Sequence, residues 1–265
     1  MTSLSDVIYS RLATAWRALR YPSPAMTVEN SQVLEYEPHI GETRQYWRDI
    51  ILGVNDGLVS VFLLVVGVVG GGLQPEQVLL TGIAGAVAGA VSMAAGEYLA
   101  TKSQDEVFEA ELSLERHHIE HFRDEEMAQL REFFQDMGVT PEDLDSVLSG
   151  FENNDEALLN AMAALEFGVV ESERRSPFRA MTASGLLFLA GSIPSVLPFA
   201  LFNSNRVALT WATILALTGL FAVGVVKATV ARTGRVRSGV ENMIIAGLGG
   251  VAAWLLGNLV GAGLT

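Results

Sequence analysis

Residues 50–72 read IILGVNDGLVSVFLLVVGVVGGG, an apolar run in which Asp56 is the only charged residue. The run is long enough to cross about 30 Å of hydrocarbon as a single helix. A carboxylate about six residues into such a helix lies roughly 9 Å below its end, where an unpaired charge costs several kcal/mol. The alternative is an interfacial aspartate that reaches water, but this side chain is too short to do so well. We therefore favour a functional role for Asp56 inside the membrane.

Four further windows are almost free of charge and have a similar length, namely 77–96, 180–205, 207–226 and 243–265. The chain has 265 residues, a mean hydropathy of +0.34 and only 18% charged residues, whereas a soluble domain carries about a quarter. These features predict an all-α, multi-pass integral membrane protein with five transmembrane helices. The absence of cysteine excludes disulfides and thiolate metal sites.

The positive charges predict the orientation of the chain in the membrane. Five Lys and Arg residues precede the first span, seven lie between the second and third, and four lie between the fourth and fifth. The loops on the other side hold Arg206 alone. Because cytosolic loops are enriched in Lys and Arg, we expect the N-terminus and the segment between spans two and three to be cytosolic.

We place the first and second transmembrane helices within residues 45–100 and the third to fifth within residues 177–265. Two further regions are expected to be cytosolic. Residues 1–44 are expected to form a short amphipathic helix at 3–20 and a proline-containing linker. Disorder throughout this region is the alternative.

Residues 101–176 are expected to form an acidic, three-helix metal-binding insert. No Gly or Pro occurs between Gly96 and Gly138, so the second span is predicted to continue far into the cytosol as one helix. Further helices are predicted at 141–149 and at about 154–173. The stretch from Asp105 to Glu173 holds 20 of the 30 carboxylates of the chain. A merely solvated acidic surface is the alternative to cation binding.

The spacing within the insert indicates a metal site. Glu111, Glu115 and His118 are spaced i, i+4, i+7 and share one helix face, which Glu126 and Gln129 continue. Glu115 and His118 form one Glu-x-x-His step, the kind of carboxylate–imidazole pair that holds iron and manganese in helical bundles. A di-iron bundle needs two such steps, and the sequence shows one.

Met162 and Glu166 lie one turn apart in the last predicted helix of the insert. Methionine usually packs in a core. Beside an acidic face it is also a soft ligand that favours Fe²⁺ over Ca²⁺ or Mg²⁺, so both interpretations stand.

Small residues recur one turn apart in the first two spans, where they predict a tight helix pair or a dimer contact. The pairs are Gly53 and Gly57, Gly67 and Gly71, and Gly85 and Gly89.

Two motifs carry a resemblance to a known family. The sequences WRDIILGVNDGL at 47–58 and GAVSMAAGEYL at 89–99 resemble those of the vacuolar iron transporter family, and the likeness covers about residues 45–265. The resemblance implies a homodimer in the lipid bilayer that exports Fe²⁺ and Mn²⁺ from the cytosol in exchange for protons. Zn²⁺ and Co²⁺ are left open as further cargo. It implies neither an enzyme, nor a permanently bound cofactor, nor a nucleic-acid partner.

The resemblance also implies roles for individual residues. Asp56 and Met93 look like residues of the transport path, and Asn55, Asp49 and Glu97 belong to the same two motifs and are included in it. In the insert, the residues that look like retained metal ligands are Glu115, Glu126, Met162 and Glu166. The sequence departs from the family pattern at His118 and Gln129, where carboxylates are expected, and at Ala163, which cannot bind metal.

Two other functions remain open at this point. One is a membrane-anchored, ferritin-like protein that binds or oxidises iron, and the other is a docking stalk on a membrane anchor. The expected location is the plasma membrane if the source is a prokaryote and a vacuolar membrane if it is a eukaryote.

Overall fold

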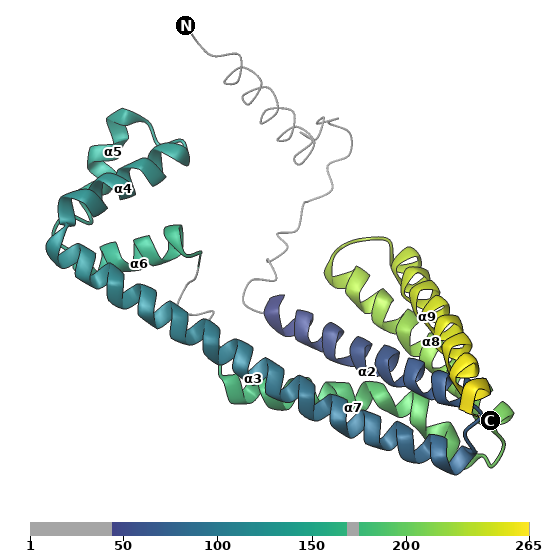
Figure 1. The fold of residues 1–265 in the computed structure, drawn as a ribbon. Coiled ribbons are helices and arrows are strands. Elements are labelled where there is room, and N and C mark those ends of the chain that lie inside the picture. The colour runs from purple at the N-terminus through teal and green to yellow at the C-terminus, as the bar shows by residue number, and fades with distance from the viewer. Residues whose placement is uncertain (1–43, 169–174, 265) are drawn as a thin grey trace, which may run out of the picture. The chain divides into compact units, whose positions relative to one another are not determined.

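The computed structural model describes residues 44–168 and 175–264, and every regular element in these ranges is an α-helix (Figure 1). This confirms the all-α class. The predicted amphipathic helix at 3–20 lies outside the described residues. The helices are α2 (Arg44–Gly70), α3 (Pro75–His121), α4 (Arg123–Asp136), α5 (Pro141–Leu148), α6 (Asp155–Glu166), α7 (Pro177–Leu201), α8 (Asn205–Val230) and α9 (Arg235–Leu264).

Five of these helices, α2, α3, α7, α8 and α9, are long and apolar enough to span a membrane, as the sequence predicts. In α3 only the first half is apolar, because after Glu76 in the first turn the next charged residue is Glu97, and charges recur from there to the end of the helix. The part of α3 that is apolar enough to span a membrane therefore ends near residue 96, and its second half is too polar to lie in hydrocarbon.

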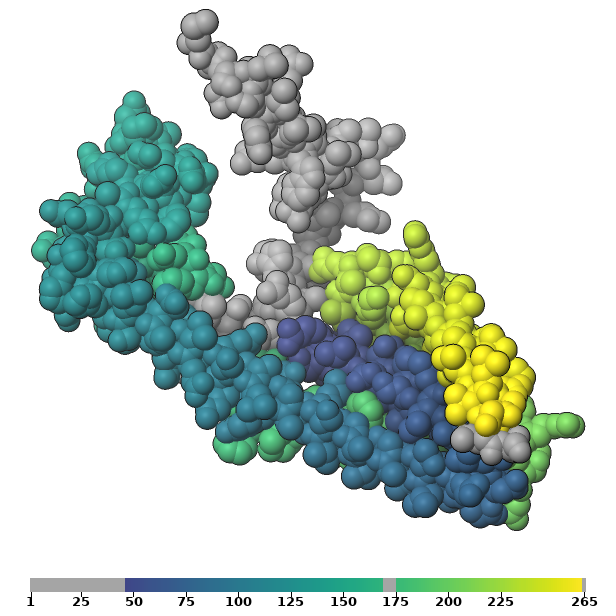
Figure 2. All heavy atoms as spheres, viewed as in Figure 1, coloured from purple at the N-terminus to yellow at the C-terminus, as the bar shows by residue number. Residues whose placement is uncertain are grey.

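The core of the membrane part lies around α2 and α7, the most buried of the five spans, whereas α9 is the least buried. Helix α7 packs against both α2 and α3, and α2 also contacts α8 and α9. Buried side chains from α2, α3, α7 and α8 form the largest cluster, which includes Val65, Ala86, Phe188 and Ala212. Figure 2 shows α3 and α9 as continuous ridges on the viewed face of this part.

Glycines allow the helices of the membrane part to approach closely. A Cβ atom on Gly57 would overlap the carbonyl oxygen of Phe188 in α7, and one on Gly191 would overlap the carbonyl oxygen of Val54. At the other end of α2, a Cβ atom on Gly257 of α9 would overlap the carbonyl oxygen of Gly67. Close helix contacts at the predicted glycines therefore exist within the chain: those of α2 face α7 and α9, whereas Gly85 and Gly89 of α3 face side chains of α2 and α7.

The prediction of one helix running from the second span to Gly138 is wrong. Helix α3 ends at His121, and α4 begins at Arg123 after a break at Phe122, whose φ and ψ are −133° and 37°. The N–H of Phe122 still donates to the carbonyl oxygen of His118, and the carbonyl oxygen of Phe122 accepts from Glu125 and Glu126. The chain changes direction here without leaving these backbone groups unpaired.

Arg123 fixes the direction of α4 after this break. Its guanidinium donates to the carbonyl oxygens of Phe151 and Glu152 and pairs with Asp155 at the start of α6. One side chain therefore ties the first turn of α4 to the turn that precedes α6.

The two remaining helices of the insert have the predicted starts. Thr140 is the N-cap of α5, although its hydroxyl donates to Asp143 and caps no backbone N–H. The side chain of Asn154 caps α6 by accepting from the N–H of Ala157. Helix α6 ends at Glu166, before the predicted 173, and Gly168 adopts a left-handed φ of 66°.

Candidate metal centre

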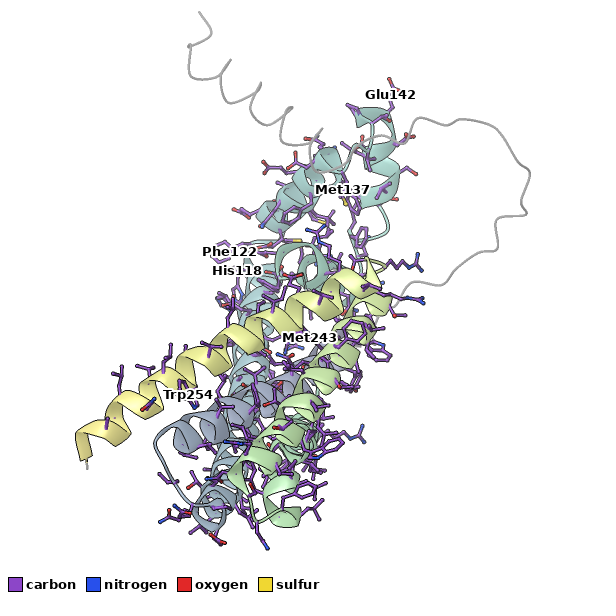
Figure 3. All side chains as sticks on the ribbon, turned by 90° about the vertical axis from the view of Figure 1, so that its right-hand side faces the viewer. His118, Phe122, Met137, Glu142, Met243 and Trp254 are labelled. Carbon is purple, nitrogen blue, oxygen red and sulfur yellow. The ribbon has the colours of Figure 1, made fainter. Side chains whose placement is uncertain are left out.

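Three of the predicted ligands meet where α3 gives way to α4. Glu115 and His118 come from α3 and Glu126 from α4, and one donor atom of each lies within 4.8 Å of the other two. The Nδ1 atom of His118 is 3.2 Å from Glu126 Oε1 and 3.9 Å from Glu115 Oε2. Figure 3 shows His118 at this end of α3, one turn before Phe122. Two carboxylates and an imidazole are a donor set that suits Fe²⁺, Mn²⁺ or Zn²⁺.

The break at Phe122 is what brings Glu126 to the other two ligands. On a straight helix, Glu115 and Glu126 would lie roughly 16 Å apart along the axis, too far to share one ion. Because α4 leaves α3 in a new direction, Glu126 lies next to His118 instead. The structure therefore brings together three of the predicted ligands, across a break that the sequence did not predict.

The two carboxylates of the group are buried and incompletely paired, whereas the His118 side chain is 37% exposed. Glu115 is 3% and Glu126 6% exposed, yet Glu115 Oε1 and Glu126 Oε2 are buried without a hydrogen-bond partner. Unpaired buried carboxylate oxygens are costly. Each carboxylate also has its other oxygen near His118 Nδ1, so a cation bound between the three residues is a fitting partner for the group. A hydrophobic cluster that includes Ile119, next to His118, adjoins the group and limits the access of water on that side. Its other buried members are Leu130, Leu148, Leu158 and Met162.

Replacement of Glu126 by glutamine should weaken metal binding by at least about tenfold, since even the outer partners of metal ligands contribute that much. The change keeps the shape of the side chain and removes its charge. Isothermal titration of the full chain in detergent with Mn²⁺ measures the effect. Glu125→Gln is the matched control, because Glu125 is the preceding residue of α4 and is exposed. Equal affinities for the two variants would contradict the site.

The carboxyl of Glu115 lies about 28 Å along α3 beyond residue 96, well outside the membrane-spanning segment. Burial, the charges of Glu126 and Glu166 and a hydrogen bond with Glu126 raise the pKa of Glu115 from 4.5 to about 7. In the metal-free protein this group therefore exchanges its proton near neutral pH. A divalent cation must displace that proton in order to bind.

The affinity of the insert for Mn²⁺ should consequently depend on pH. Above the raised pKa the Glu115 carboxylate is already ionised, so affinity should be nearly constant. Below about pH 7 the cation competes with one proton, and affinity should fall by up to about tenfold per pH unit. Titrations of Mn²⁺ at pH 6, 7 and 8 measure this, and an affinity unchanged between pH 6 and 8 would contradict the assignment.

The other predicted ligands of the insert lie around the group of three. Glu111 and Gln129 are half-buried. Met162 is fully buried in the hydrophobic cluster, which supports its packing role, and its role as a soft ligand stays a prediction. Glu166 is exposed but close enough to raise the pKa of Glu115. Ala163 is buried.

In the membrane part, Asp56 is half-buried and accepts a hydrogen bond of 2.7 Å from the hydroxyl of Ser60, one turn along α2. The Oδ1 atom of the neighbouring Asn55 is buried without a hydrogen-bond partner. Met93 of α3 packs against the cluster that contains Ala90 and Phe188. The polar groups of Asn55 and Asp56 thus lie within an otherwise apolar span.

Asp49 and Glu97, the other two predicted path residues, lie at one end of the membrane part, where Arg175 joins them. The guanidinium of Arg175 pairs with Asp49 Oδ2 and is 3.7 Å from Glu97 Oε1. No pattern in the sequence indicates a role for Arg175, because the residue is 126 positions from Asp49. Its only local signal is its place just before Pro177, the first residue of α7.

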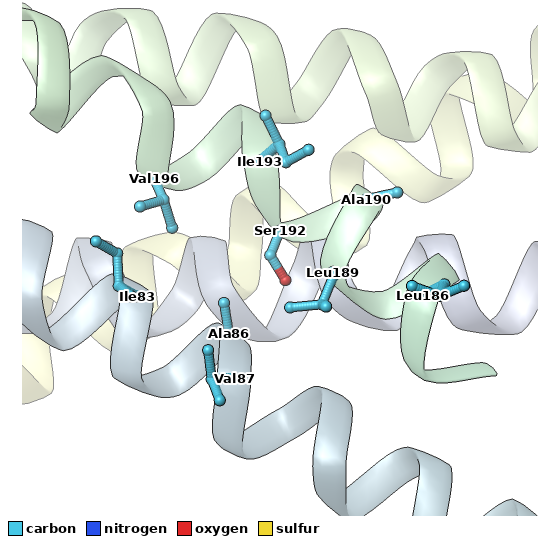
Figure 4. Close-up of a pocket in the computed structure, with 9 residues that line it drawn as sticks. All are labelled: Ile83, Ala86, Val87, Leu186, Leu189, Ala190, Ser192, Ile193 and Val196. Carbon is cyan, nitrogen blue, oxygen red and sulfur yellow. The ribbon is translucent and has the colours of Figure 1, made fainter. Parts of the chain in front are cut away.

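A surface groove of about 430 Å³ between α3 and α7 is apolar (Figure 4). Ile83 and Val87 line it from α3, and Leu189 and Ile193 from α7. The hydroxyl of Ser192, its one polar side chain, donates to the carbonyl oxygen of Phe188. Such a lining offers a cation no ligand and suits contact with hydrocarbon.

Five helices fit to span a membrane, together with two buried carboxylates and a histidine on a helical insert, define an integral, multi-pass membrane protein with a candidate metal centre. More specifically, the chain belongs to the VIT family, whose model matches residues 47–258.

Individual relatives agree with this family and with the resemblance noted in the sequence. Vacuolar iron transporter 1 of Tulipa gesneriana is 29% identical over 237 residues, which cover 89% of this chain and 96% of the relative. Vacuolar iron transporter 2 of Oryza sativa subsp. japonica is 31% identical over 210 residues, or 78% and 84% of the two chains. The vacuolar iron transporter of Toxoplasma gondii is 28% identical over 242 residues, or 86% and 80%. These relatives are named as transporters, in agreement with the expectation that the chain is not an enzyme.

Proposed function

We propose that the protein transports divalent iron and manganese out of the cytosol in exchange for protons, as a homodimer. The observation that carries the proposal concerns α3. This helix is long and apolar enough to span a membrane, and it also supplies Glu115 and His118 to the candidate metal centre. Family membership and the names of the relatives support iron as cargo. The donor chemistry accommodates Mn²⁺ as well, and leaves Zn²⁺ and Co²⁺ as further cargo to be tested.

In this proposal the chain has four parts. Residues 1–44 precede the transporter, 45–100 and 177–265 form the spans, and 101–176 form a cytosolic insert. The insert binds cations and raises their local concentration, an effect expected of its acidic surface. This orientation follows the distribution of Lys and Arg along the sequence.

Asp56 is the central group of the proposed path. As a carboxylate inside a span, it binds the cation when ionised and accepts a proton when the cation has left. Met93 supplies a soft thioether, and the unpaired amide oxygen of Asn55 supplies a further ligand. Proton binding to Asp56 then resets the site for the next ion.

The experiment that tests the proposal is flux into proteoliposomes that hold a metal-quenched dye. A pH gradient is imposed, and Mn²⁺ or anaerobic Fe²⁺ is added outside. We expect quenching that depends on both the protein and the gradient. Quenching without a gradient dependence would refute proton exchange, and no flux of either metal in a folded, monodisperse sample would refute transport.

Iron oxidation by a ferritin-like centre receives less support. It requires a second carboxylate–imidazole step, and His118 is the only histidine of the donor group found in the described residues. The same sample tested for oxygen uptake on addition of Fe²⁺ distinguishes the two functions.

A further inference from the structure

The ends of two membrane helices share one cation in this structure. Asp49 lies in the second turn of α2, and Glu97 lies where α3 leaves its apolar segment. Their side chains are 8% and 19% exposed. Arg175, which precedes α7, bridges them through Nη2 to Asp49 and Nη1 to Glu97. The two carboxylates therefore form a cation site occupied by a guanidinium of the same chain.

Arg175 is held in this position from more than one side. Its side chain is 13% exposed, and its guanidinium carbon lies 5.6 Å from the centre of the Tyr46 ring, a cation–π distance. Arg48 also approaches both carboxylates, at 3.4 Å from Asp49 and 4.0 Å from Glu97, but is 63% exposed. Arg175 is thus the central cation and Arg48 a peripheral one.

A pair of carboxylates from two helices is also a ligand set for a divalent cation. If a monovalent ion replaced Arg175, the partly buried guanidinium would lose its partners. The attraction of the two carboxylates to that ion would be no stronger than their attraction to the guanidinium, so the exchange would not be favourable. A divalent ion brings twice the charge in a smaller radius, so its attraction to the two carboxylates exceeds that of the guanidinium. The exchange therefore favours divalent over monovalent cations.

We infer that Arg175 is a specificity-determining residue, a tethered competitor that occupies the Asp49–Glu97 site until a divalent cation displaces it. The inference rests on the proposed function in one respect, since it places this site on the transport path. In the resting protein Arg175 keeps the site closed to K⁺ and Na⁺. Without Arg175, divalent ions bind more tightly and monovalent ions gain access.

The test compares wild type, Arg175→Gln and Arg179→Gln in the proteoliposome assay. Arg179 is an exposed arginine in the first turn of α7 and serves as the matched control. Initial rates are measured against Mn²⁺ concentration at low and high K⁺, with ionic strength held constant by N-methylglucamine. We expect Arg175→Gln to lower KM for Mn²⁺ by about five- to tenfold at low K⁺, the lower range for coupled sites. In this variant alone, KM should rise as K⁺ replaces N-methylglucamine.

An unchanged or higher KM in Arg175→Gln, with or without a lower kcat, would overturn the inference and assign Arg175 a structural role. If wild type transports neither metal, the proposed function fails, and equilibrium binding decides the inference separately. Mn²⁺ binding to Glu126→Gln in detergent is then compared with binding to Glu126→Gln combined with Arg175→Gln. Tighter binding to the double variant that K⁺ weakens supports the inference, and equal binding overturns it.

Discussion

Asp56→Asn should reduce gradient-driven Mn²⁺ uptake to the background of vesicles without protein. The substitution preserves the size of the side chain and its ability to accept a hydrogen bond from Ser60. It removes the negative charge that we propose binds the cation, and with it the group proposed to accept the exchanged proton. The uptake assay with the metal-quenched dye measures the loss. Normal uptake by Asp56→Asn would remove Asp56 from the mechanism.

Ser60→Ala is the matched control for this variant. It removes the 2.7 Å hydrogen bond to Asp56 and leaves the carboxylate in place. One such bond contributes about 1 kcal/mol, so uptake should change by no more than about fivefold. Melting temperatures in detergent should be similar for both variants and wild type, which separates loss of transport from loss of folding.

Gly57→Leu should strongly destabilise the membrane part. A Cβ atom at this position would overlap the carbonyl oxygen of Phe188, and backbone atoms of a packed helix cannot move aside as a flexible side chain can. Overpacking of this kind costs about 3 kcal/mol or more, which corresponds to a fall of roughly 6–12 °C in Tm for a chain of this size. Thermal unfolding in detergent, followed by size-exclusion chromatography, measures the effect.

Gly247→Leu provides the comparison. Gly247 lies in α9, another spanning helix, and a Cβ atom there would meet nothing within 4 Å. The same substitution should therefore leave Tm within about 2 °C of wild type, because no packed atom has to move. Similar losses in both variants would show that the close approach of α2 and α7 does not limit stability.

The number of spans and the residues of the candidate metal centre were predictable from the sequence to different degrees. Five apolar windows of sufficient length were enough to predict five spans, since length and apolar character alone decide whether a helix can cross a bilayer. Glu115 and His118 were predictable because helical spacing places them on one face. Glu126 was assigned to the same continuous helix, whereas the structure brings it back across the break at Phe122.

The break itself has no signal in the local sequence. Neither Gly nor Pro occurs near Phe122, and the contacts that accompany the break are tertiary, from Arg123 to the turn before α6. Arg175 was missed for a related reason, since its partners lie on two helices that are remote in sequence. Helical spacing predicts which residues share one face of a helix. It does not predict which other helices their side chains will contact.

The uninterrupted course of α3 has an electrostatic consequence. Glu97 and Glu115 belong to the same helix and lie about 27 Å apart along its axis. This separation exceeds three Debye lengths at physiological ionic strength, where the length is about 8 Å. The charge of a cation bound beside Glu115 is therefore screened before it reaches Asp49 and Glu97. If the insert supplies ions to the membrane as proposed, its loading should leave the electrostatic potential at Asp49 and Glu97 unchanged, so we expect the two sites to bind cations independently.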